Sequence, residues 1–452
     1  MKSAASNTDP ITQRATGLND QPLRPEGNAV VYLMSRDQRL EDNHALLLAQ
    51  AEAKRLELPL TIVFVLRHQN GHRAFEHYAF MIEGLRELAQ TAARLHISFQ
   101  LVDAVTAMKA FASAAAVYTD FSPLRGARRW QERLAQKLHC PVVQVDTHNI
   151  VPVWVASDKQ EFAARTLRSK INRLLPDFLI SPGQLERHPY GKPETKIDEE
   201  HIQQVLAALR RNGQKLIRQS GEKAAHAQCK DFIKQRLDGY AERRNDPVQD
   251  GLSGLSPYMH FGQISSLRVA LEVMAAKNER NAADFDAFLE ELIVRKELSD
   301  NFCYYNTQYD NLAGAPDWAK ATLAKHAQDE RAFIYSRQEL ADGLTHDAAW
   351  NASQQQLKKT GKMHGYMRMY WAKKVLEWSE SPEQAIEHLI YLNDFYSIDG
   401  ADSNGYVGIL WSVAGLHDRP WFERPIFGTV RYMNENGLRR KFALDDYIQK
   451  FA

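Results

Sequence analysis

Hydrophobic residues follow two different spacings in the first part of the chain. Short apolar runs of strand length occupy residues 29–35, 59–66, 97–103, 115–121 and 140–146. Between them, segments such as 42–58 and 77–96 carry apolar residues every three to four positions, as amphipathic helices do. Strands that alternate with such helices predict a Rossmann-like parallel sheet covered by helices on both faces.

The pattern changes after residue 180. Residues 181–225 are rich in proline, glycine and charge, which favours an interdomain linker. Helical periodicity then dominates to the end of the chain. It is clearest over residues 225–244, 265–277, 285–302, 362–378 and 381–394. The sequence therefore predicts an α/β domain over 28–180 and an all-helical domain over 226–452, in which Ser381 caps a helix that begins at Pro382.

Composition narrows the class of protein. A chain of 452 residues is longer than one ordinary hydrophobic core supports, so two or more domains are expected. A content of 44% hydrophobic and 25% charged residues is typical of a folded globular protein. The net charge of +1 gives no overall sign of nucleic-acid binding, although a local basic patch is compatible with it. Three scattered cysteines form no metal or disulfide pattern, which favours a reducing compartment. Residues 1–27 lack a signal-peptide core and are interpreted as a flexible tail, so a cytoplasmic protein, monomeric by default, is expected.

The ends of two predicted strands carry polar residues. These are the segments SRDQR (35–39) and TDFSPLR (119–125). Parallel sheets bind ligands at the carboxyl ends of their strands, so these segments are candidates for a ligand crevice. Neither contains the glycine pattern of a dinucleotide or P-loop site, which disfavours a dehydrogenase or an ATPase.

Two segments of the helical half carry candidate polar sites. In GLSGLSP (251–257), small residues precede a helix that Ser256 is placed to cap, which suits an anion site but is more often an ordinary loop. Residues 285–302 carry Glu291 and Arg295 at a spacing that most often forms an ion pair on a solvated face.

The segment KMHGYMRMYWAKKVLEW (362–378) raises a charge problem. Trp371 and Trp378 lie seven positions apart, hence on nearly one helix face and roughly 10.5 Å apart along the axis. Arg368 lies one turn before Trp371 on that face, and a buried arginine needs a carboxylate or an anionic ligand. The two tryptophans suit either electron transfer or simple core packing.

Aromatic residues and arginines are interleaved near the end of the chain. Between residues 391 and 433, Trp411 and Trp421 alternate with Arg419, Arg424 and Arg431. Rings that stack on bases and guanidinium groups that hold phosphates are typical of nucleic-acid contact, although such rings also pack in cores.

Together these segments resemble class II cyclobutane pyrimidine dimer photolyases. The resemblance runs in order from about residue 29 to 450 and includes SRDQR, TDFSPLR, RNDP with LSPYMHFGQIS, DAAWNASQQQLKKTGKMHGYMRMYWAKKVLEW and LNDFYSIDGADSNGY. Members of this family have an α/β domain and a helical FAD-binding domain, and they use light to repair pyrimidine dimers in DNA. The resemblance thus implies a carbon–carbon lyase that binds UV-damaged DNA, single- or double-stranded, and acts on cyclobutane dimers rather than (6-4) photoproducts.

The resemblance also implies roles around FAD, which is active in its anionic reduced form. Arg368 and Asp399 match a buried ion pair beside the flavin, and Asn393 matches the residue that faces flavin N5. Trp371 and Trp350 match the chain of tryptophans that reduces FAD, and Trp378 matches a further member of it. The segment around the diphosphate corresponds to Tyr240, Leu252, Ser253, Gly254, Leu255 and Ser256.

Substrate roles carry over in the same way. Glu291 matches the carboxyl that hydrogen-bonds the dimer, and Met369 and Trp411 match the pocket wall. Arg244, Asn245 and Arg419 match residues that approach the opened duplex, and Trp421 lies in the same arginine-rich segment. One departure stands out: the tryptophan that often follows the acidic residue by one turn is replaced here by Val294 or Arg295, so the aromatic clamp on the dimer is expected to be weaker.

Two further expectations complete this interpretation. The N-terminal domain is expected to hold an antenna chromophore, a deazaflavin or a folate. The alternatives are a cryptochrome-like photoreceptor, which Asn393, Glu291 and the absence of a long extension past Ala452 disfavour, and a nucleotide-binding α/β protein fused to a helical interaction module. A bound yellow chromophore distinguishes the last of these.

Overall fold

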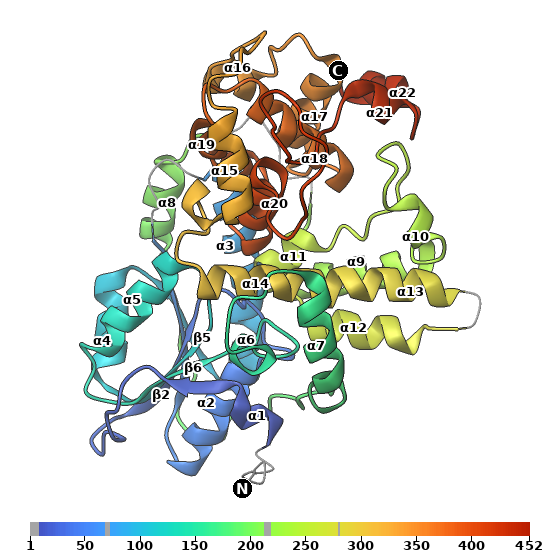
Figure 1. Cartoon of the computed structure of the whole chain (residues 1–452). Coiled ribbons are helices and arrows are strands. Elements are labelled where there is room, and N and C mark those ends of the chain that lie inside the picture. Colours follow the sequence, from blue (N-terminus) through green and yellow to red (C-terminus); the bar gives the residue numbers. More distant parts are fainter. Residues whose placement is uncertain (1–8, 68–72, 212–217, 279–280) are drawn as a thin grey trace, which may run out of the picture.

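The computed structural model describes residues 9–67, 73–211, 218–278 and 281–452. Figure 1 shows an α/β part at the bottom and a helical part above it, with the long stretch from α13 to α14 running between them. This arrangement confirms the predicted fold class of a largely parallel sheet followed by a helical region.

One seven-stranded sheet forms the core of the α/β part, with the strand order β1-β6-β5-β2-β3-β4-β7. Its strands are β1 (Ala15–Gly17), β2 (Ala29–Met34), β3 (Leu60–Val65), β4 (Ser98–Val102), β5 (Ala114–Asp120), β6 (Val142–Val145) and β7 (Thr195–Ile197). All neighbours pair in parallel except β1 and β6. The five strands predicted from apolar runs are therefore confirmed as β2 to β6.

Helices cover both faces of this sheet, as the alternating pattern predicts. On one face, α2 (His44–Arg55) and α3 (Phe75–Arg94) pack their apolar residues against β2 and β3. On the other, α4 (Ala104–Ala112) and α5 (Arg125–Ala135) cover the same strands. The strands are buried on both sides, which explains why they read as continuous apolar runs.

The prediction of a flexible tail over residues 1–27 is wrong for its described part. Residues 9–27 contain α1 (Pro10–Gln13) and β1, which pairs with β6. Arg14 is fully buried and its guanidinium donates to the carbonyl oxygens of Asn149 at 2.9 Å and Ile150 at 2.5 Å. A polar, aperiodic edge strand leaves no hydrophobic signal in the sequence, because it is held by backbone pairing with β6 and by the contacts of Arg14 with residues 146–150. Residues 1–8 lie outside the described residues.

The predicted linker over 181–225 is also partly a piece of the α/β unit. Its residues include β7, which extends the sheet beside β4, and α8 (Glu199–Ala207), whose Ile202 and Val205 join the core under α3. The strand has only three residues and an exposed burial pattern, so no period could reveal it. Residues 212–217 of this segment lie outside the described residues.

The remaining elements are helices. They are α6 (Val153–Ala156), α7 (Ala164–Phe178), α9 (Glu222–Gln235), α10 (Tyr240–Arg243), α11 (Ser256–His260), α12 (Ser266–Ala275), α13 (Ala282–Leu289), η2 (Glu290–Arg295), α14 (Lys296–Tyr305), η3 (Leu312–Gly314), α15 (Asp317–Lys325), α16 (Arg337–Asp342), α17 (Ala348–Thr360), α18 (Gly365–Glu377), α19 (Pro382–Tyr396), α20 (Ser403–Ala414), α21 (Glu435–Arg439) and α22 (Leu444–Phe451). Ser381 caps α19 as predicted, because its side chain accepts a hydrogen bond from the Gln384 amide.

Two predicted helices are interrupted. Gly239, with φ of +79°, separates α9 from α10, and the Asp284 carboxylate holds the Gly239 and Ala241 amides at 2.8 and 2.9 Å. Only glycine adopts this backbone conformation readily, so the pattern over 225–244 folds as two helices. The second interruption is η2, one π-helical segment between α13 and α14. Such segments often occur at functional sites.

Buried ion pairs join the α/β part to the helical part. Arg36, after β2, binds Asp300 of α14 through two hydrogen bonds of 2.9 and 3.0 Å, and the Asp300 side chain is 1% exposed.

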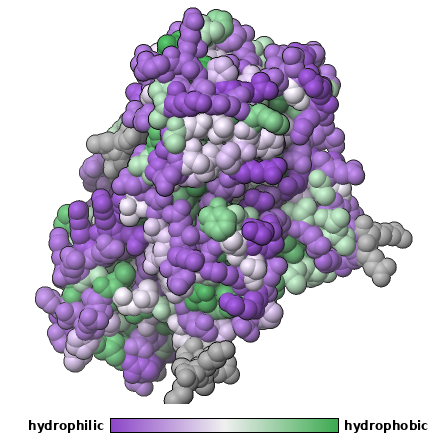
Figure 2. All heavy atoms as spheres, viewed as in Figure 1, coloured by the Kyte–Doolittle hydropathy of each residue, from purple (hydrophilic) through white to green (hydrophobic). Residues whose placement is uncertain are grey.

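Figure 2 shows that one face of the molecule is largely hydrophilic, with hydrophobic residues in small scattered groups. Among the described residues, no helix has the length and apolar character that crossing a membrane requires.

Candidate functional site

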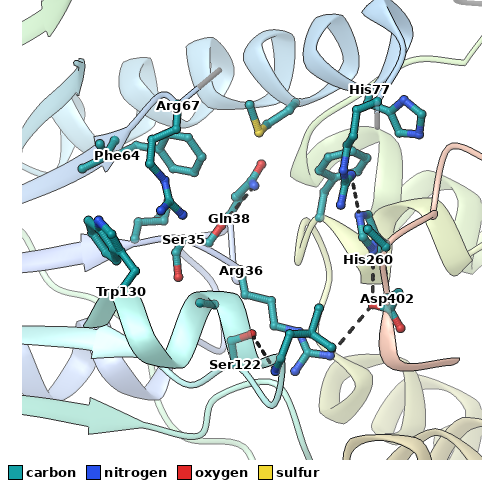
Figure 3. Close-up of a pocket in the computed structure, with 18 of the residues that line it drawn as sticks. Ser35, Arg36, Gln38, Phe64, Arg67, His77, Ser122, Trp130, His260 and Asp402 are labelled. Carbon is teal, nitrogen blue, oxygen red and sulfur yellow. Dashed lines mark hydrogen bonds and ion pairs between the residues drawn. The ribbon is translucent and has the colours of Figure 1, made fainter. Parts of the chain in front are cut away.

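A cavity of about 230 Å³ lies where the carboxyl ends of the strands meet the helical part. Figure 3 shows Arg67 and Trp130 on one side and His77, His260 and Asp402 on the other. Its lining includes Ser35, Arg36 and Gln38 from SRDQR, and Ser122 and Leu124 from TDFSPLR. The two strand ends therefore line one cavity, and their role in binding a ligand stays a prediction.

Asp120 organises the turn at the rim of this cavity. Its carboxylate accepts the backbone N–H groups of Ser35, Arg36 and Asp37 at 2.8, 2.6 and 2.9 Å. Burial and the nearby Asp37 raise the pKa of Asp120 to about 6. The strand end thus fixes the direction of Arg36, which reaches across to Asp300.

The cavity wall combines polar and aromatic groups. The Arg67 guanidinium lies 4.6 Å from the Trp130 ring centroid, a cation–π contact. Opposite them, His260 Nδ1 lies 3.1 Å from the Asp402 carboxylate. A flat aromatic ligand of moderate size fits a crevice with such walls better than a phosphate group does.

A second cluster lies before α18 and around the loop 251–257. Asp399 pairs with Lys362, whose ammonium also donates to Ser256 Oγ at 2.6 Å. Burial alone would raise the pKa of Asp399, but Lys362 and Arg368 hold it well below its usual value. The predicted contact of Asp399 with Arg368 is therefore replaced by a contact with Lys362, while Arg368 acts on Asp399 from a greater distance. The spacing of Arg368 and the tryptophans in the sequence gives no indication that Lys362 is the partner of Asp399.

This cluster holds more positive than negative charge. Burial, Arg368 and Arg218 lower the pKa of Lys362 to about 8, against the attraction of Asp399. Arg218 also donates to the Gly254 carbonyl at 3.3 Å. Three cations beside one carboxylate form a site that favours an anionic ligand.

The loop 251–257 is built differently from the predicted helix cap. Leu255 precedes α11, and Ser256 is the first helical residue, so its hydroxyl faces Lys362 instead of capping the helix. The Leu255 side chain is fully buried in the core, which leaves only its backbone for a ligand. Gly254 has φ of +69°, and Gln228 fixes this turn by donating to the Ser253 carbonyl at 2.7 Å. Leu252 remains exposed at 36%.

Asn393 lies buried near the N-terminal end of α20. Its amide nitrogen donates to Asp394 Oδ1 at 3.0 Å, and a Cβ at Gly405 would lie 2.8 Å from that nitrogen. Burial raises the pKa of Asp394, which the sequence did not single out. The glycine therefore permits the close approach that holds the amide in place.

Three tryptophans form a continuous buried group in the core of the helical part. The Trp350 and Trp371 rings are stacked at 6.2 Å with an angle of 11°, and Trp378 meets Trp350 at 5.7 Å. All three are at most 2% exposed. The indole of Trp371 donates to Gln354 at 3.0 Å and that of Trp350 to the Trp371 carbonyl at 2.9 Å. Trp350 lies between the other two, an order that the spacing of Trp371 and Trp378 could not show.

The π-helical segment η2 turns its two adjacent glutamates to different partners. Glu291 binds Arg244, the residue that follows α10, at 2.9 Å, while Glu290 binds Arg168 and, at 3.2 Å, Arg295. The predicted pair of Glu291 with Arg295 is therefore wrong. Glu291 is 42% exposed, so it remains accessible to a ligand. The Tyr240 ring centroid lies 5.9 Å from the Arg244 guanidinium.

His364 connects this glutamate cluster to α18. Burial and Arg368 lower its pKa to about 4, while Asp246 and the backbone at Arg244 act in the opposite direction. Asn245 is exposed beside them. The predicted groups around 244–246 and Arg368 therefore border the same imidazole.

Aromatic and cationic side chains alternate between α20 and residue 431. Trp411 lies between Lys373, at 5.2 Å from its ring centroid, and Arg431, at 5.9 Å. Arg431 also lies over Trp421 at 4.7 Å, and Arg419 approaches that ring at 5.8 Å. Trp421 is 38% exposed and Arg419 is exposed. Met369 is partly exposed on α18, which packs against α20.

Comparison with known proteins identifies the family. The family model for DNA photolyase matches residues 30–194. A deoxyribodipyrimidine photo-lyase of Potorous tridactylus is 44% identical over 96% of this chain and 83% of its own length, and one of Arabidopsis thaliana is 45% identical over 95% and 90%.

The chain belongs to the DNA photolyase family.

Solved structures of the family share the fold at lower sequence identity. A class III photolyase of Agrobacterium tumefaciens superposes with a TM-score of 0.71 at 18% identity and covers the whole of this chain and 88% of its own. A cryptochrome of Synechocystis gives a TM-score of 0.69 at 16% identity, covering 94% of this chain and 89% of its own. The photolyase fold thus extends over both parts of the molecule.

Proposed function

We propose that this photolyase repairs cyclobutane pyrimidine dimers as a class II enzyme, by light-driven electron transfer in a helical domain that binds reduced FAD. Homology over nearly the whole chain supports the repair of DNA by light. The observation that carries the site assignment is that α18 and the residues before it combine surplus cations with buried tryptophans. An anionic, redox-active ligand suits this combination. The cryptochrome-like alternative has only a shared fold in its favour.

Lys362, Ser256 and the backbone of the loop 251–257 would bind FAD through its negative charge. An archaeal relative of the same fold, a photolyase of Sulfolobus tokodaii, is described with two FAD molecules. Arg368 and Lys362 would stabilise a reduced, anionic flavin by charge, and Asn393 would offer it an amide that supplies no acidic proton. When bound, reduced FAD supplies light absorption and the electron that splits the dimer.

The lesion would bind between η2 and α20. Glu291 and Arg244 form a polar edge of this region, and Trp411 and Met369 offer apolar surface. Arg419, Trp421, Arg431 and Asn245 would contact the opened duplex, since arginines hold phosphates and aromatic rings stack on bases. Rotating bases out of the duplex costs least free energy for a damaged, poorly stacked pair, and this difference contributes to selectivity for the lesion.

Arg295 already has a carboxylate partner, which does not favour it as a substitute for the absent aromatic clamp. Its guanidinium binds Glu290, which Arg168 also holds, and it is 50% exposed. We infer that Arg295 keeps Glu290 away from Glu291, so that Glu291 alone faces the lesion. Selectivity then depends on Trp411 without a second stacking ring.

Trp371, Trp350 and Trp378 would pass electrons inward to keep the enzyme reduced. Their contacts of 5.7 to 6.2 Å form an unbroken path within α17 and α18. The cavity at the strand ends would hold the antenna chromophore. Its aromatic and cationic walls at Trp130 and Arg67 suit a flat, conjugated deazaflavin or folate ring.

Two measurements test this function. The purified protein should show the visible absorption of a bound flavin, and the reduced protein should restore intact thymines in a dimer-containing oligonucleotide only under illumination. A flavin-free protein would contradict the cofactor assignment. A flavoprotein that changes its absorption in light but leaves the dimers intact would instead support the photoreceptor alternative.

A further inference from the structure

The tryptophan path does not end at Trp378 but meets a cluster of aromatic side chains at the surface. The Trp378 ring contacts Tyr335 at 5.4 Å and His346 at 5.2 Å, both edge to face. The Tyr335 amide donates to the Trp378 carbonyl at 3.2 Å, which fixes this segment against the tryptophan. Tyr335 is partly buried and His346 is exposed, so the cluster connects the buried path to solvent.

Tyr335 and His346 are joined by a short hydrogen bond. The Tyr335 hydroxyl lies 2.7 Å from His346 Nδ1 and accepts the His346 backbone N–H at 3.0 Å. In the tautomer that carries its proton on Nε2, the imidazole accepts the phenol proton at Nδ1. Phe333 stacks on the imidazole at 3.9 Å and 23°, which restricts the orientation of the ring. The phenol thus already points at a base.

We propose that Tyr335 is the final electron donor of the path and that His346 is the base that takes its proton. This inference rests on the proposed electron path through the three tryptophans. When Trp378 has given up an electron, its radical cation takes one electron from the Tyr335 ring. The O–H bond of Tyr335 breaks and an N–H bond forms at Nδ1 of His346. The products are neutral Trp378, a neutral tyrosyl radical and an imidazolium ion, so charge and atoms balance.

A base is needed at this position because oxidation makes a phenol strongly acidic. Tyrosine therefore gives up an electron readily only when its proton leaves at the same time. A proton acceptor within hydrogen-bond distance satisfies the geometric requirement for such a transfer. Trp378 contacts the rings of Trp350, Tyr335 and His346, and of these three only His346 carries a basic nitrogen.

Burial at Trp378 favours moving the radical outward. The Lys374 ammonium lies 5.6 Å from the Trp378 ring centroid, but it is paired with Glu377 at 2.9 Å, so its charge is largely balanced. Trp378 itself is 2% exposed, and an apolar, buried position disfavours a radical cation on the indole. After the transfer, the imidazolium lies at the surface in water, where its charge is stabilised. The charge-separated state, in which the electron is on the flavin and the radical is on Tyr335, is thereby prolonged. An external reductant then reaches the tyrosyl radical at an exposed site.

Transient absorption of the FAD-loaded protein tests the pair directly. In the unchanged protein, decay of the tryptophan radical should coincide with growth of the neutral tyrosyl radical, and both should slow in heavy water. His346→Gln keeps a hydrogen-bond acceptor but removes the base, and should slow tyrosyl formation on the order of 10²-fold. Tyr335→Phe should abolish the tyrosyl signal and prolong the tryptophan radical. With His346→Gly, imidazole added to the buffer should restore part of the lost rate.

Two variants far from Trp378 serve as matched controls for the loss of a histidine and of a tyrosine hydroxyl. His139→Gln and Tyr190→Phe, in the α/β part, should leave both radical signals unchanged. If the tryptophan radical forms but decays alike in all variants, the Tyr335–His346 inference is wrong and the tryptophan path stands. If no tryptophan radical forms in the unchanged protein, the proposed electron path itself fails. Tyrosyl formation that persists unaltered in His346→Gln would rule out His346 as the proton acceptor.

Discussion

At the scale of single residues, the charge at the candidate flavin site has a different origin from the one predicted. The pattern of α18 predicted that a buried Arg368 needs a carboxylate or an anionic ligand. Arg368 is only partly buried, and Asp399 contacts Lys362 instead. A lysine outside the helix and six residues before Arg368 shares no face with it. The pairing depends on how the loop at 397–402 returns to α18, which local periodicity does not encode.

The pKa of Lys362 predicts a pH dependence of FAD binding. Because burial and two arginines lower this pKa to about 8, the free protein loses the Lys362 proton above that pH. An anionic ligand requires the protonated form, so binding takes up a proton and the dissociation constant rises with pH, by up to about tenfold per unit. Fluorescence titration of the apoprotein with FAD at about pH 7 to 9.5, a range that brackets the Lys362 pKa of about 8, measures this dissociation constant. Lys362→Arg, which stays charged, should flatten the profile; an unchanged slope would exclude Lys362 as its source.

Two adjacent glutamates offer a matched test of the lesion site. Glu291→Gln should lower dimer affinity or repair yield roughly tenfold or more, since a hydrogen bond to a charged group contributes about 1.5–3 kcal/mol. Glu290→Gln should have little effect on repair, because Glu290 faces Arg168 and Arg295. Repair yield per absorbed photon in the reduced protein compares the two. Equal losses in both variants would show that the carboxylates act through the helix and not on the lesion.

At the scale of elements, regular segments were predictable and interruptions were not. Strands β2 to β6 and the long helices follow from apolar spacing, because each buries one or two continuous faces. The edge strands β1 and β7 have three residues each, too few for a period. The π-helical segment η2 keeps the same residue types as an α-helix, yet it turns Glu290 and Glu291 to different partners. The tertiary contacts of η2 with α7 and with Arg244 determine this outcome.

The buried tryptophans of α17 and α18 predict separable activities. Trp371→Phe should slow photoreduction of oxidised FAD strongly, because the stacked contact with Trp350 at 6.2 Å is the inner step of the proposed path. Repair by protein that is already reduced should remain largely intact. Illumination of the oxidised protein with an external reductant, followed by a repair assay after chemical reduction, measures both. A parallel loss of the two activities would contradict the electron-path role.

At the scale of the whole molecule, the α/β and helical parts depend on a buried charged interface. Asp300→Asn removes one partner of a nearly inaccessible pair with Arg36 and should destabilise the protein by about 3–5 kcal/mol. Lys277→Met, which breaks a largely exposed pair with Asp286, should cost no more than about 1 kcal/mol. Urea unfolding followed by circular dichroism compares the two. Similar midpoints for both variants would show that the interface contributes little to stability.

The sequence predicted the existence of two parts more reliably than their boundaries. The α/β unit extends from β1 to α8, beyond the predicted limits of 28 and 180, because its edge strands return from distant segments. The cavity between the parts was predictable only at the ends of β2 and β5. Its opposite wall, with His260 of α11 and Asp402 just before α20, belongs to the helical part, which no sheet rule places there.

The central claim is that this protein splits pyrimidine dimers with light. The most direct measurement is the conversion of a thymine dimer in a short oligonucleotide by the reduced holoprotein under blue light, with an identical sample in the dark. Restoration of intact thymines in light alone, with the flavin spectrum unchanged after turnover, is the predicted result. Dimers that persist in light at full flavin occupancy, although bound by the protein, would contradict the claim.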